Sequence, residues 1–217
     1  MGLLSAKTEL KEGKYSWFRG GAQAYLNIKK EKNNHYHISG DCYYGVSRKY
    51  GPNMGDLDFL APLKNGKIIY KSKEKYIDYT FILTINKDNS FDVDEKGETT
   101  PFGHNATFYG HFTSDDLPSF SCEKVSSFVE HAICDTVKVA RLDKKMARSY
   151  AQYKSAFFFE KEQASLEKKL RKEQKAWIQK RNKCEFEKAY QNCLTKCYTQ
   201  RIKRLDKQFN SFWKYDD

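Results

Sequence analysis

The sequence contains no long hydrophobic run, and this absence argues against a membrane-spanning helix. A helix that crosses a bilayer needs about 20 consecutive apolar residues, whereas the longest aromatic block here is Phe157-Phe158-Phe159. The sequence also lacks a Walker loop and a dinucleotide-binding glycine pattern, since Gly20-Gly21 has no surrounding βαβ pattern. These absences exclude integral helical membrane proteins and the common nucleotide-dependent enzymes.

Glycine and proline are missing from the chain after residue 118. All 12 glycines lie at or before Gly110, and all 4 prolines lie at or before Pro118. Because these residues punctuate structure, the first half is typical of a β-protein, and the second half can form long helices. We predict a polar lead-in over residues 1–14, an antiparallel β-domain over 15–116 and a helical domain over 117–217.

Short segments in the first half alternate apolar and polar residues, as half-buried strands do. The clearest of these segments are 24–28, 77–85 and 91–93. Asn65-Gly66 is the strongest hairpin signal, because both residues tolerate the positive φ angles of a tight turn. Seven or eight such strands joined by short turns predict an antiparallel β-barrel or sandwich.

The second half spaces its apolar residues three or four apart, which is the period of an amphipathic helix. Three stripes of this kind run through residues 139–157, 166–184 and 194–209, and a shorter helix is expected over 126–134. The pattern predicts an antiparallel helical hairpin with a third helix. The whole chain is therefore expected to be of the α+β class.

The excess of positive charge is concentrated in the helical half. Residues 1–116 hold 16 Lys and Arg against 15 Asp and Glu, whereas residues 117–217 hold 23 against 13. A surface with this excess favours acidic partners, and Lys168, Lys169 and Lys172 are the expected partner-binding cations. Nucleic acid is the weaker alternative, because acidic residues interleave with these lysines in i,i+4 pairs, as on a solvated helix face.

No set of residues predicts an active site or a metal centre. His35 and His37 lie on one side of a predicted strand near Cys42, but a zinc site needs more ligands, so surface histidines are the better interpretation. The last three cysteines have the spacing Cys-x8-Cys-x3-Cys, which matches no common zinc motif. No cysteine lies in a motif that would activate it as a nucleophile. We therefore predict a protein with no enzymatic activity, cofactor or metal.

The cysteines of the helical half stand in fixed register with Trp, Arg and Tyr positions. The series runs Cys122-x11-Cys134, Gln174-x2-Trp177-x3-Arg181-x2-Cys184 and Cys193-Leu194-x3-Tyr198-x2-Arg201-Ile202. This arrangement resembles the helical module of the LprI-type lysozyme inhibitors of bacterial cell envelopes, over roughly residues 120–205. The resemblance implies an exported, disulfide-stapled binding protein, not an enzyme. We expect four residues to be structural anchors of this module: Trp177, Arg181, Tyr150 and Tyr198.

Six cysteines suit a disulfide framework in an oxidising compartment. The family pattern supplies four of them, and Cys42 and Cys197 are additional. If Cys134 opens one helix of the hairpin and Cys184 closes the other, the two lie at the same end and can form a bridge. Assigning the remaining cysteines in turn gives the expected pairs Cys134–Cys184, Cys122–Cys193 and Cys42–Cys197, the last of which would join the two domains.

These expectations combine into a cell-envelope protein that inhibits another protein. The resemblance implies a lysozyme-like peptidoglycan hydrolase as the target, and the paired carboxylates of such an enzyme are natural ligands for Lys and Arg. Because animal lysozymes are generally basic, the strong positive charge favours an acidic target. An immunity protein that neutralises a secreted periplasmic toxin is therefore the first alternative. A polyanion or nucleic-acid binder is the second.

Two further expectations concern location and the aromatic block. The segment Leu3-Leu4-Ser5-Ala6 is too short for the apolar core of a signal peptide. We therefore expect the sequence to be the mature part of a periplasmic or cell-envelope protein. One helix face cannot bury three consecutive phenylalanines, so at least one of 157–159 should contact the β-domain. Phe158 is the alternative candidate, as an exposed anchor for a partner.

Overall fold

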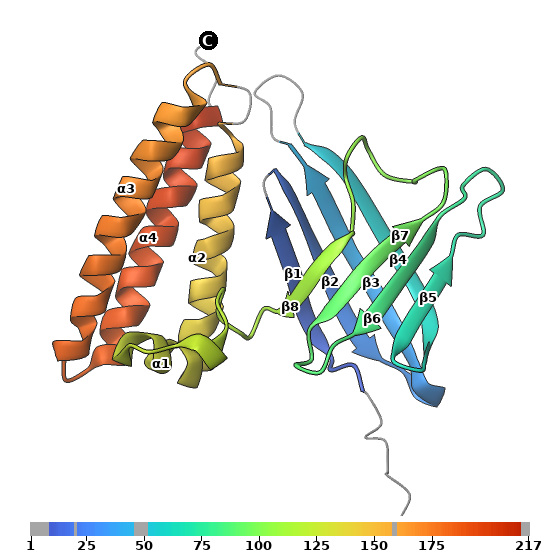
Figure 1. Cartoon of the computed structure of the whole chain (residues 1–217), viewed down its shortest axis with the longest axis horizontal. Helices are drawn as coiled ribbons and strands as arrows, with labels where there is room; N and C mark the ends of the chain where they lie inside the picture. Colours follow the sequence, from blue (N-terminus) through green and yellow to red (C-terminus); the bar gives the residue numbers. More distant parts are fainter. Residues whose placement is uncertain (1–8, 20, 46–51, 158–159, 214–217) are drawn as a thin grey trace, which may run out of the picture. The chain divides into compact units, whose positions relative to one another are not determined.

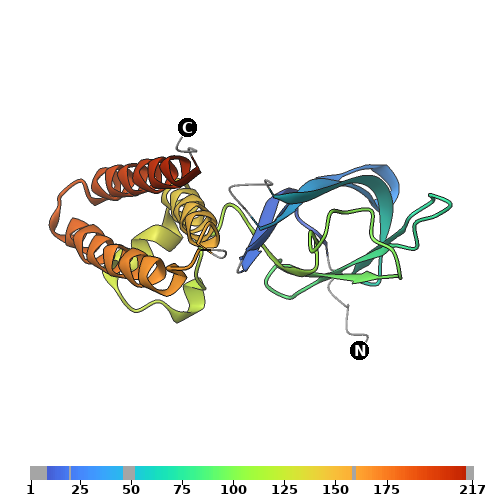
Figure 2. The same cartoon turned by 90° about the horizontal axis from the view of Figure 1, so that it is seen from above.

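The computed structural model describes residues 9–19, 21–45, 52–157 and 160–213. The chain divides into two compact units (Figures 1 and 2): one holds the strands, and the other holds the helices from residue 115 onward. None of the described helices is both long and apolar enough to cross a membrane.

The first unit is a closed antiparallel barrel of eight strands, and it confirms the barrel alternative of the sequence-based prediction. Strand β1 pairs with β8, so the sheet has no free edge. The strands are β1 (Gly13–Arg19), β2 (Ala22–Lys30), β3 (His35–Tyr44), β4 (Asn53–Lys64), β5 (Lys67–Lys71), β6 (Thr80–Ile85), β7 (Phe91–Lys96) and β8 (Gly110–Ser114).

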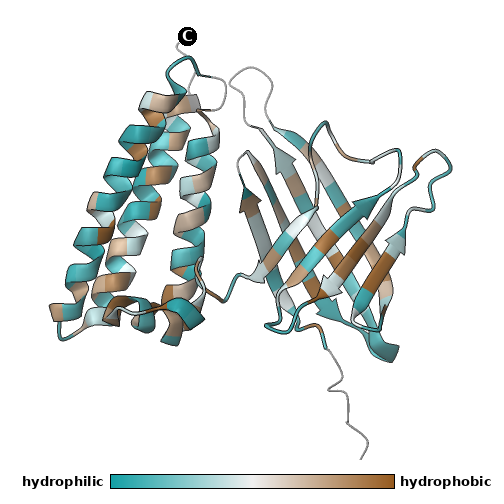
Figure 3. Ribbon diagram, viewed as in Figure 1, coloured by the Kyte–Doolittle hydropathy of each residue, from teal (hydrophilic) through white to brown (hydrophobic). Residues whose placement is uncertain are grey.

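Hydrophobic and hydrophilic residues alternate along the strands (Figure 3), and this period-two pattern places apolar side chains in the core of the barrel. Strand β2, for example, buries Ala24, Leu26 and Ile28 and exposes Asn27 and Lys29. The β4–β5 hairpin turns at Asn65 and Gly66, whose φ angles of 51° and 72° confirm the predicted turn.

The second unit contains four α-helices and two short 3-10 turns. The helices are α1 (Phe128–Asp135), α2 (Val137–Ser155), α3 (Gln163–Asn182) and α4 (Tyr190–Trp213), and the 3-10 turns are η2 (Cys122–Lys124) and η3 (Lys183–Phe186). Helices α2, α3 and α4 lie side by side, and α1 lies at one end of them (Figures 1 and 2). The predicted hairpin with a third helix and a short preceding helix is confirmed.

The core of the helical unit is built mainly from α2 and α4. Helix α4 buries Leu194, Tyr198, Ile202 and Leu205, against which α2 packs its own apolar stripe. Helix α3 differs, because its only fully buried described residues are Leu170 and Arg181. Most of its residues are hydrophilic (Figure 3), so few apolar contacts hold α3 in place.

The disulfide pairing predicted from the sequence is wrong. The bonds join Cys122 to Cys134 and Cys184 to Cys193, with Cα–Cα distances of 6.0 and 5.6 Å. Cys42 and Cys197 are free thiols. The expected pairs Cys134–Cys184, Cys122–Cys193 and Cys42–Cys197 are therefore all absent.

The error comes from treating Cys134 as the start of the long helix, although the shorter helix expected over 126–134 ends at this residue. Cys134 lies in the last turn of α1, not at the start of a long helix, because the chain leaves the helical conformation at Thr136 (φ −120°, ψ 97°). Its bond with Cys122 therefore closes the short segment around α1, and Cys184–Cys193 closes the turn between α3 and α4. Cys42 is fully buried in the core of the barrel.

Of the aromatic block 157–159, the structure describes only Phe157. Phe157 is buried in the core of the helical unit, where its ring lies 4.8 Å from Tyr153 and 5.4 Å from Phe212. Phe158 and Phe159 lie outside the described residues. Phe157 therefore contributes to the helical core itself.

Candidate functional site

A buried polar chain at the centre of the helical unit links its three long helices. The hydroxyl of Tyr198 on α4 donates to Asp143 Oδ1 on α2 at 2.7 Å, and it accepts from Arg181 Nη1 on α3 at 3.0 Å. The second oxygen of Asp143 accepts hydrogen bonds from the backbone N–H and the hydroxyl of Ser119, at 2.7 and 2.6 Å. Each side chain of this buried polar chain therefore has a hydrogen-bond partner, as buried polar groups require.

Arg181, an anchor predicted from the sequence, is held by two neighbouring side chains. The structure connects Arg181 to Asp143 through the Tyr198 hydroxyl, and the Arg181 Nε and Nη2 groups donate to Asn182 Oδ1 at 3.0 and 2.8 Å. Burial, together with the negative charge of Asp143, raises the pKa of Tyr198 well above its ordinary value. The phenol thus stays protonated and keeps its donor role.

A groove runs between α3 and α4 next to this polar chain. It has a volume of about 420 Å³, within the range of ligand-sized clefts. Both helices contribute residues at the spacing i, i+3, i+4 and i+7, which is one face of a helix. Its lining is Glu173, Ala176, Trp177 and Lys180 from α3, and Cys197, Gln200, Arg201 and Arg204 from α4.

Trp177 forms the aromatic wall of the groove. Its ring lies 5.2 Å from the ring of Tyr198, its Nε1 donates to the Cys197 carbonyl oxygen at 3.3 Å, and the Arg181 guanidinium lies 5.6 Å from its centroid. The indole is therefore fixed in orientation while part of it remains accessible. A rigid, partly exposed Trp beside cations is typical of protein-recognition sites.

Cations outnumber carboxylates in the groove. Its one carboxylate, Glu173, has its Oε2 atom 3.6 Å from Arg201 Nη1 and 3.4 Å from Arg204 Nη2. Lys180 adds a third positive charge on the α3 side. Since one carboxylate faces three cations, the groove has excess positive charge that suits an acidic ligand.

Arg201 is the most buried of these cations. Its side chain is 2 % exposed, and its Nε donates to Gln174 Oε1 at 3.1 Å. Burial lowers the pKa of Arg201 and the nearby Glu173 opposes this effect, which leaves the guanidinium charged in any case. Among the described residues, its Nη2 group has no hydrogen-bond partner.

The cations predicted as partner-binding lie on α3, close to the groove in sequence. Lys168, Lys169 and Lys172 are all exposed. Lys169 is four residues before Glu173 and so extends the groove-facing stripe, whereas Lys168 is directed to another face of the helix. Phe158, the other predicted contact, lies outside the described residues.

The predicted anchors lie in or beside the core. Tyr198 is fully buried and Arg181 is 7 % exposed, while Trp177 and Tyr150 are partly buried against the same cluster. Gln174 was part of the sequence motif without a role. In the structure it bridges two helices, donating to Met146 Sδ at 3.3 Å on one side and accepting from Arg201 on the other.

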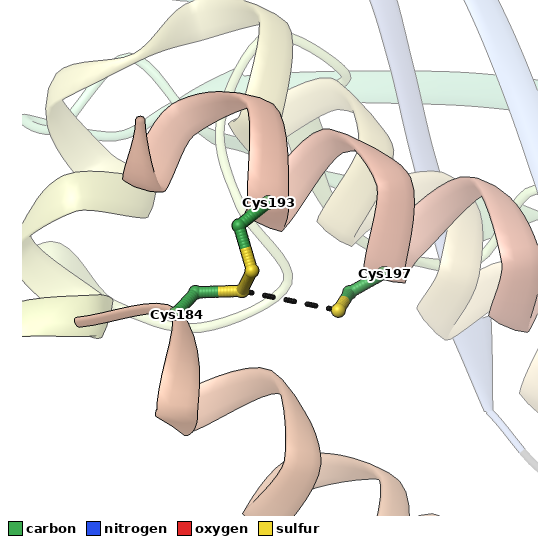
Figure 4. A group of neighbouring side chains, drawn as sticks. All are labelled: Cys184, Cys193 and Cys197. Atoms are coloured by element: carbon green, nitrogen blue, oxygen red, sulfur yellow. Dashed lines mark hydrogen bonds between the residues drawn. A yellow bond between two sulfur atoms is a disulfide. The ribbon is translucent and has the colours of Figure 1, made fainter. Parts of the chain in front are cut away.

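Three cysteines lie close together (Figure 4), and one of them, Cys197, lines the groove. The Sγ atoms of Cys184, Cys193 and Cys197 lie within 4.8 Å of one another. Cys184 and Cys193 are bonded to each other, and the Cys197 Sγ is 3.8 Å from the Cys184 Sγ. Because two of these sulfurs are oxidised, the cluster as it stands offers one thiol and no set of thiolate ligands for zinc.

The groove could not be found from the sequence, although its residues carried a signal. The two i, i+3, i+4, i+7 stripes are visible in the sequence, but nothing there shows that they face each other.

On the β-domain, His37 Nε2 and Asp58 Oδ1 are 2.7 Å apart and His111 Nδ1 and Asp92 Oδ1 are 2.8 Å apart. Both are exposed cross-strand pairs, typical of a solvated barrel surface.

Comparison with known proteins supplies the context for this geometry. No curated protein and no solved structure matches the chain. Residues 122–205 match the family model described as Lysozyme inhibitor LprI. This range begins at the first disulfide and ends within α4, so it includes both disulfides, every residue of the groove, and Asp143, Arg181 and Tyr198 of the buried polar chain. The resemblance noted in the sequence is confirmed: the helical unit of this chain matches the LprI lysozyme-inhibitor family.

Proposed function

We propose that this chain is an inhibitor that binds another protein through its helical unit, with the α3–α4 groove as the contact surface. The observation that carries the proposal is that every groove-lining residue lies between Glu173 and Arg204, inside the range that matches the inhibitor family. The match supports an inhibitory role. The groove offers fixed aromatic and cationic groups for recognition.

A peptidoglycan hydrolase of the lysozyme type is the proposed target. Such enzymes place two carboxyl groups in an open cleft, and Lys or Arg side chains bind carboxylates through charge-assisted hydrogen bonds. Lys180 and Arg204 are exposed at the groove, so either could enter such a cleft. Inhibition would then result from occupation of the cleft, without any chemical step on the inhibitor.

Charge favours an acidic target within this class. The formal net charge of the chain is +11, so a strongly basic lysozyme would be repelled at long range, whereas an acidic one would be attracted. The same observation supports a second candidate, an immunity protein that neutralises an acidic secreted toxin. The disulfides Cys122–Cys134 and Cys184–Cys193 support action in an oxidising compartment, such as the periplasm or cell envelope.

The test compares hydrolases of opposite net charge. The purified chain is added to an acidic and to a basic lysozyme-type enzyme, and the loss of turbidity of a peptidoglycan suspension is followed. We expect stronger inhibition of the acidic enzyme, with an association rate that falls as salt shortens the screening length to ~8 Å at physiological ionic strength. Inhibition of neither enzyme, together with capture of a secreted toxin, would favour the immunity function. Salt-steep binding to DNA alone would favour a polyanion binder.

Two charge-matched variants locate the contact. Lys180→Glu reverses a cation in the groove, whereas Lys175→Glu makes the same change on a different face of α3, five residues away. We expect Lys180→Glu to weaken inhibition at least tenfold and Lys175→Glu to have little effect. Equal losses would mean that only long-range charge matters. If neither change has an effect, the contact lies outside the groove.

A further inference from the structure

The free thiol of Cys197 lies against the disulfide that closes the α3–α4 turn. Its Sγ is 3.8 Å from the Cys184 Sγ, and the two atoms are in contact (Figure 4). The Cys184 sulfur is bonded to Cys193 and has no hydrogen, so Cys197 must be the donor in this contact. The arrangement brings a nucleophile next to a sulfur atom that thiolates attack.

We propose that Cys197 and the Cys184–Cys193 bond form an internal thiol–disulfide exchange site, in which Cys184 bonds alternately to Cys193 and to Cys197. The Cys197 thiolate attacks the Cys184 Sγ, a Cys184–Cys197 bond forms, and the Cys184–Cys193 bond breaks. The electron pair leaves on the Cys193 sulfur, which takes up the proton that Cys197 released. The exchange needs no external oxidant or reductant.

The positions of the two α4 cysteines explain why Cys184 is the sulfur that is shared. Cys193 and Cys197 are four residues apart on α4, one turn of helix, so their side chains project from the same side. Cys184 faces both of them from η3. A bond within α4, between Cys193 and Cys197, would require two parallel side chains to turn toward each other, whereas either one can reach across to Cys184.

One side-chain movement precedes the exchange. All three sulfurs lie within 4.8 Å of one another, so Cys197 lies beside the Cys184–Cys193 bond and not on its extension. Attack along the bond axis therefore requires Cys197 to rotate about χ1. Cys197 is partly exposed and can rotate on a timescale far shorter than the minutes to hours typical of uncatalysed disulfide rearrangement.

The exchange changes the groove. Cys197 is one of the groove-lining residues, whereas Cys193 is not. In the observed state the free thiol of Cys197 lines the groove. After exchange Cys197 is part of a disulfide, and the free thiol belongs to Cys193, one turn nearer the start of α4. The site therefore offers two forms of the same surface.

The sequence makes the two forms easy to distinguish. Trypsin cleaves after Lys183, Lys188, Lys196 and Arg201, which separates the three cysteines into the peptides CEFEK, AYQNCLTK and CYTQR. The full chain is incubated at mildly alkaline pH, where more thiolate is present, and its free thiols are then blocked with N-ethylmaleimide before digestion. We expect the label on both AYQNCLTK and CYTQR, and CEFEK linked to either of them. Label confined to CYTQR after prolonged incubation would overturn the proposal.

Two variants test the same site independently. In Cys193→Ser, oxidised glutathione should produce a single CEFEK–CYTQR link, and Cys197→Ser should hold the original bond with no labelled AYQNCLTK. Recovery of Cys184 and Cys197 as separate thiols or glutathione adducts in Cys193→Ser would contradict the proposal. The Cys122–Cys134 link, measured in the same digest, reports whether the variant is folded. Cys42 serves as the unreactive reference, because burial raises the pKa of its thiol to about 12.

Discussion

Replacing Tyr198 with phenylalanine should strongly destabilise the helical unit. The change removes one oxygen atom and keeps the ring that packs on Trp177. That oxygen donates to Asp143 and accepts from Arg181, and all three residues are buried. Tyr198→Phe therefore leaves a carboxylate and a guanidinium each without one partner.

The size of the effect follows from the two lost hydrogen bonds. Hydrogen bonds to charged groups contribute about 1.5–3 kcal/mol each, and an unpaired buried group costs about as much. Because the remaining partners, Ser119 and Asn182, still pair with Asp143 and Arg181, we expect a loss of about 3 kcal/mol in the free energy of unfolding.

The assay is urea unfolding followed by far-UV circular dichroism, which reports the helices. Tyr150→Phe is the matched control: Tyr150 is partly buried against the same core, and its hydroxyl makes no hydrogen bond to another described residue. The control should change stability by less than about 0.5 kcal/mol. A difference between the two variants of less than about 0.5 kcal/mol would refute the idea that the polar chain holds the three helices together.

Two more predictions concern pH and the barrel. Lys144 is 4 % exposed, and burial lowers its pKa from 10.5 to about 8. Between these values the unfolded chain binds more protons than the folded one, so the helical unit should gain up to about 3 kcal/mol as pH rises through this window. Lys144→Met should abolish the gain in urea titrations at several pH values, and an unchanged slope would contradict this assignment. In the barrel, a Cβ at Gly40 would lie 2.0 Å from the Tyr25 carbonyl oxygen, so Gly40→Ala should cost at least ~3 kcal/mol in thermal unfolding of the barrel, while the helical signal stays unchanged.

The sequence predicts the fold well where one side chain pattern determines one structure. Alternation in segments such as 24–28 has only one compact solution, a strand with one face buried. Asn65-Gly66 closes the β4–β5 hairpin, because few other residue pairs accept two positive φ angles. In the helical half, the stripes through 139–157 and 194–209 match the faces that α2 and α4 bury against each other.

The disulfides show where such reasoning fails. The break between α1 and α2 at Thr136 has no Gly or Pro to mark it, and the apolar pattern continues across it from Ile133 to Val139. The expected pairing places Cys134 at the start of the long helix, although the shorter helix expected over 126–134 ends at this residue. Disulfide connectivity depends on the relative positions of elements, which local patterns do not contain.

The groove is unpredictable for a related reason: it exists because α3 packs incompletely. A helix that buried a full apolar face against α4 would fill the space between them, but α3 fully buries only Leu170 and Arg181 among its described residues. Its hydrophilic sequence indicates an exposed helix. Only the structure shows that the exposed side of α3 and the exposed side of α4 meet around Trp177.

This weak apolar attachment makes the polar and covalent links of α3 decisive for the shape of the groove. Arg181 ties α3 to Tyr198, Glu173 pairs with two arginines of α4, and the Cys184–Cys193 bond holds the turn between the helices. Closing a loop of this length contributes about 3 kcal/mol in the chain-entropy model, comparable with the cost expected for losing the Tyr198 hydroxyl. Because the cysteine that closes this loop also contacts the Cys197 thiol in the groove, the bond that fixes α3 is the one that exchange would move. Recognition by the groove and the state of its disulfide are therefore coupled through the same turn.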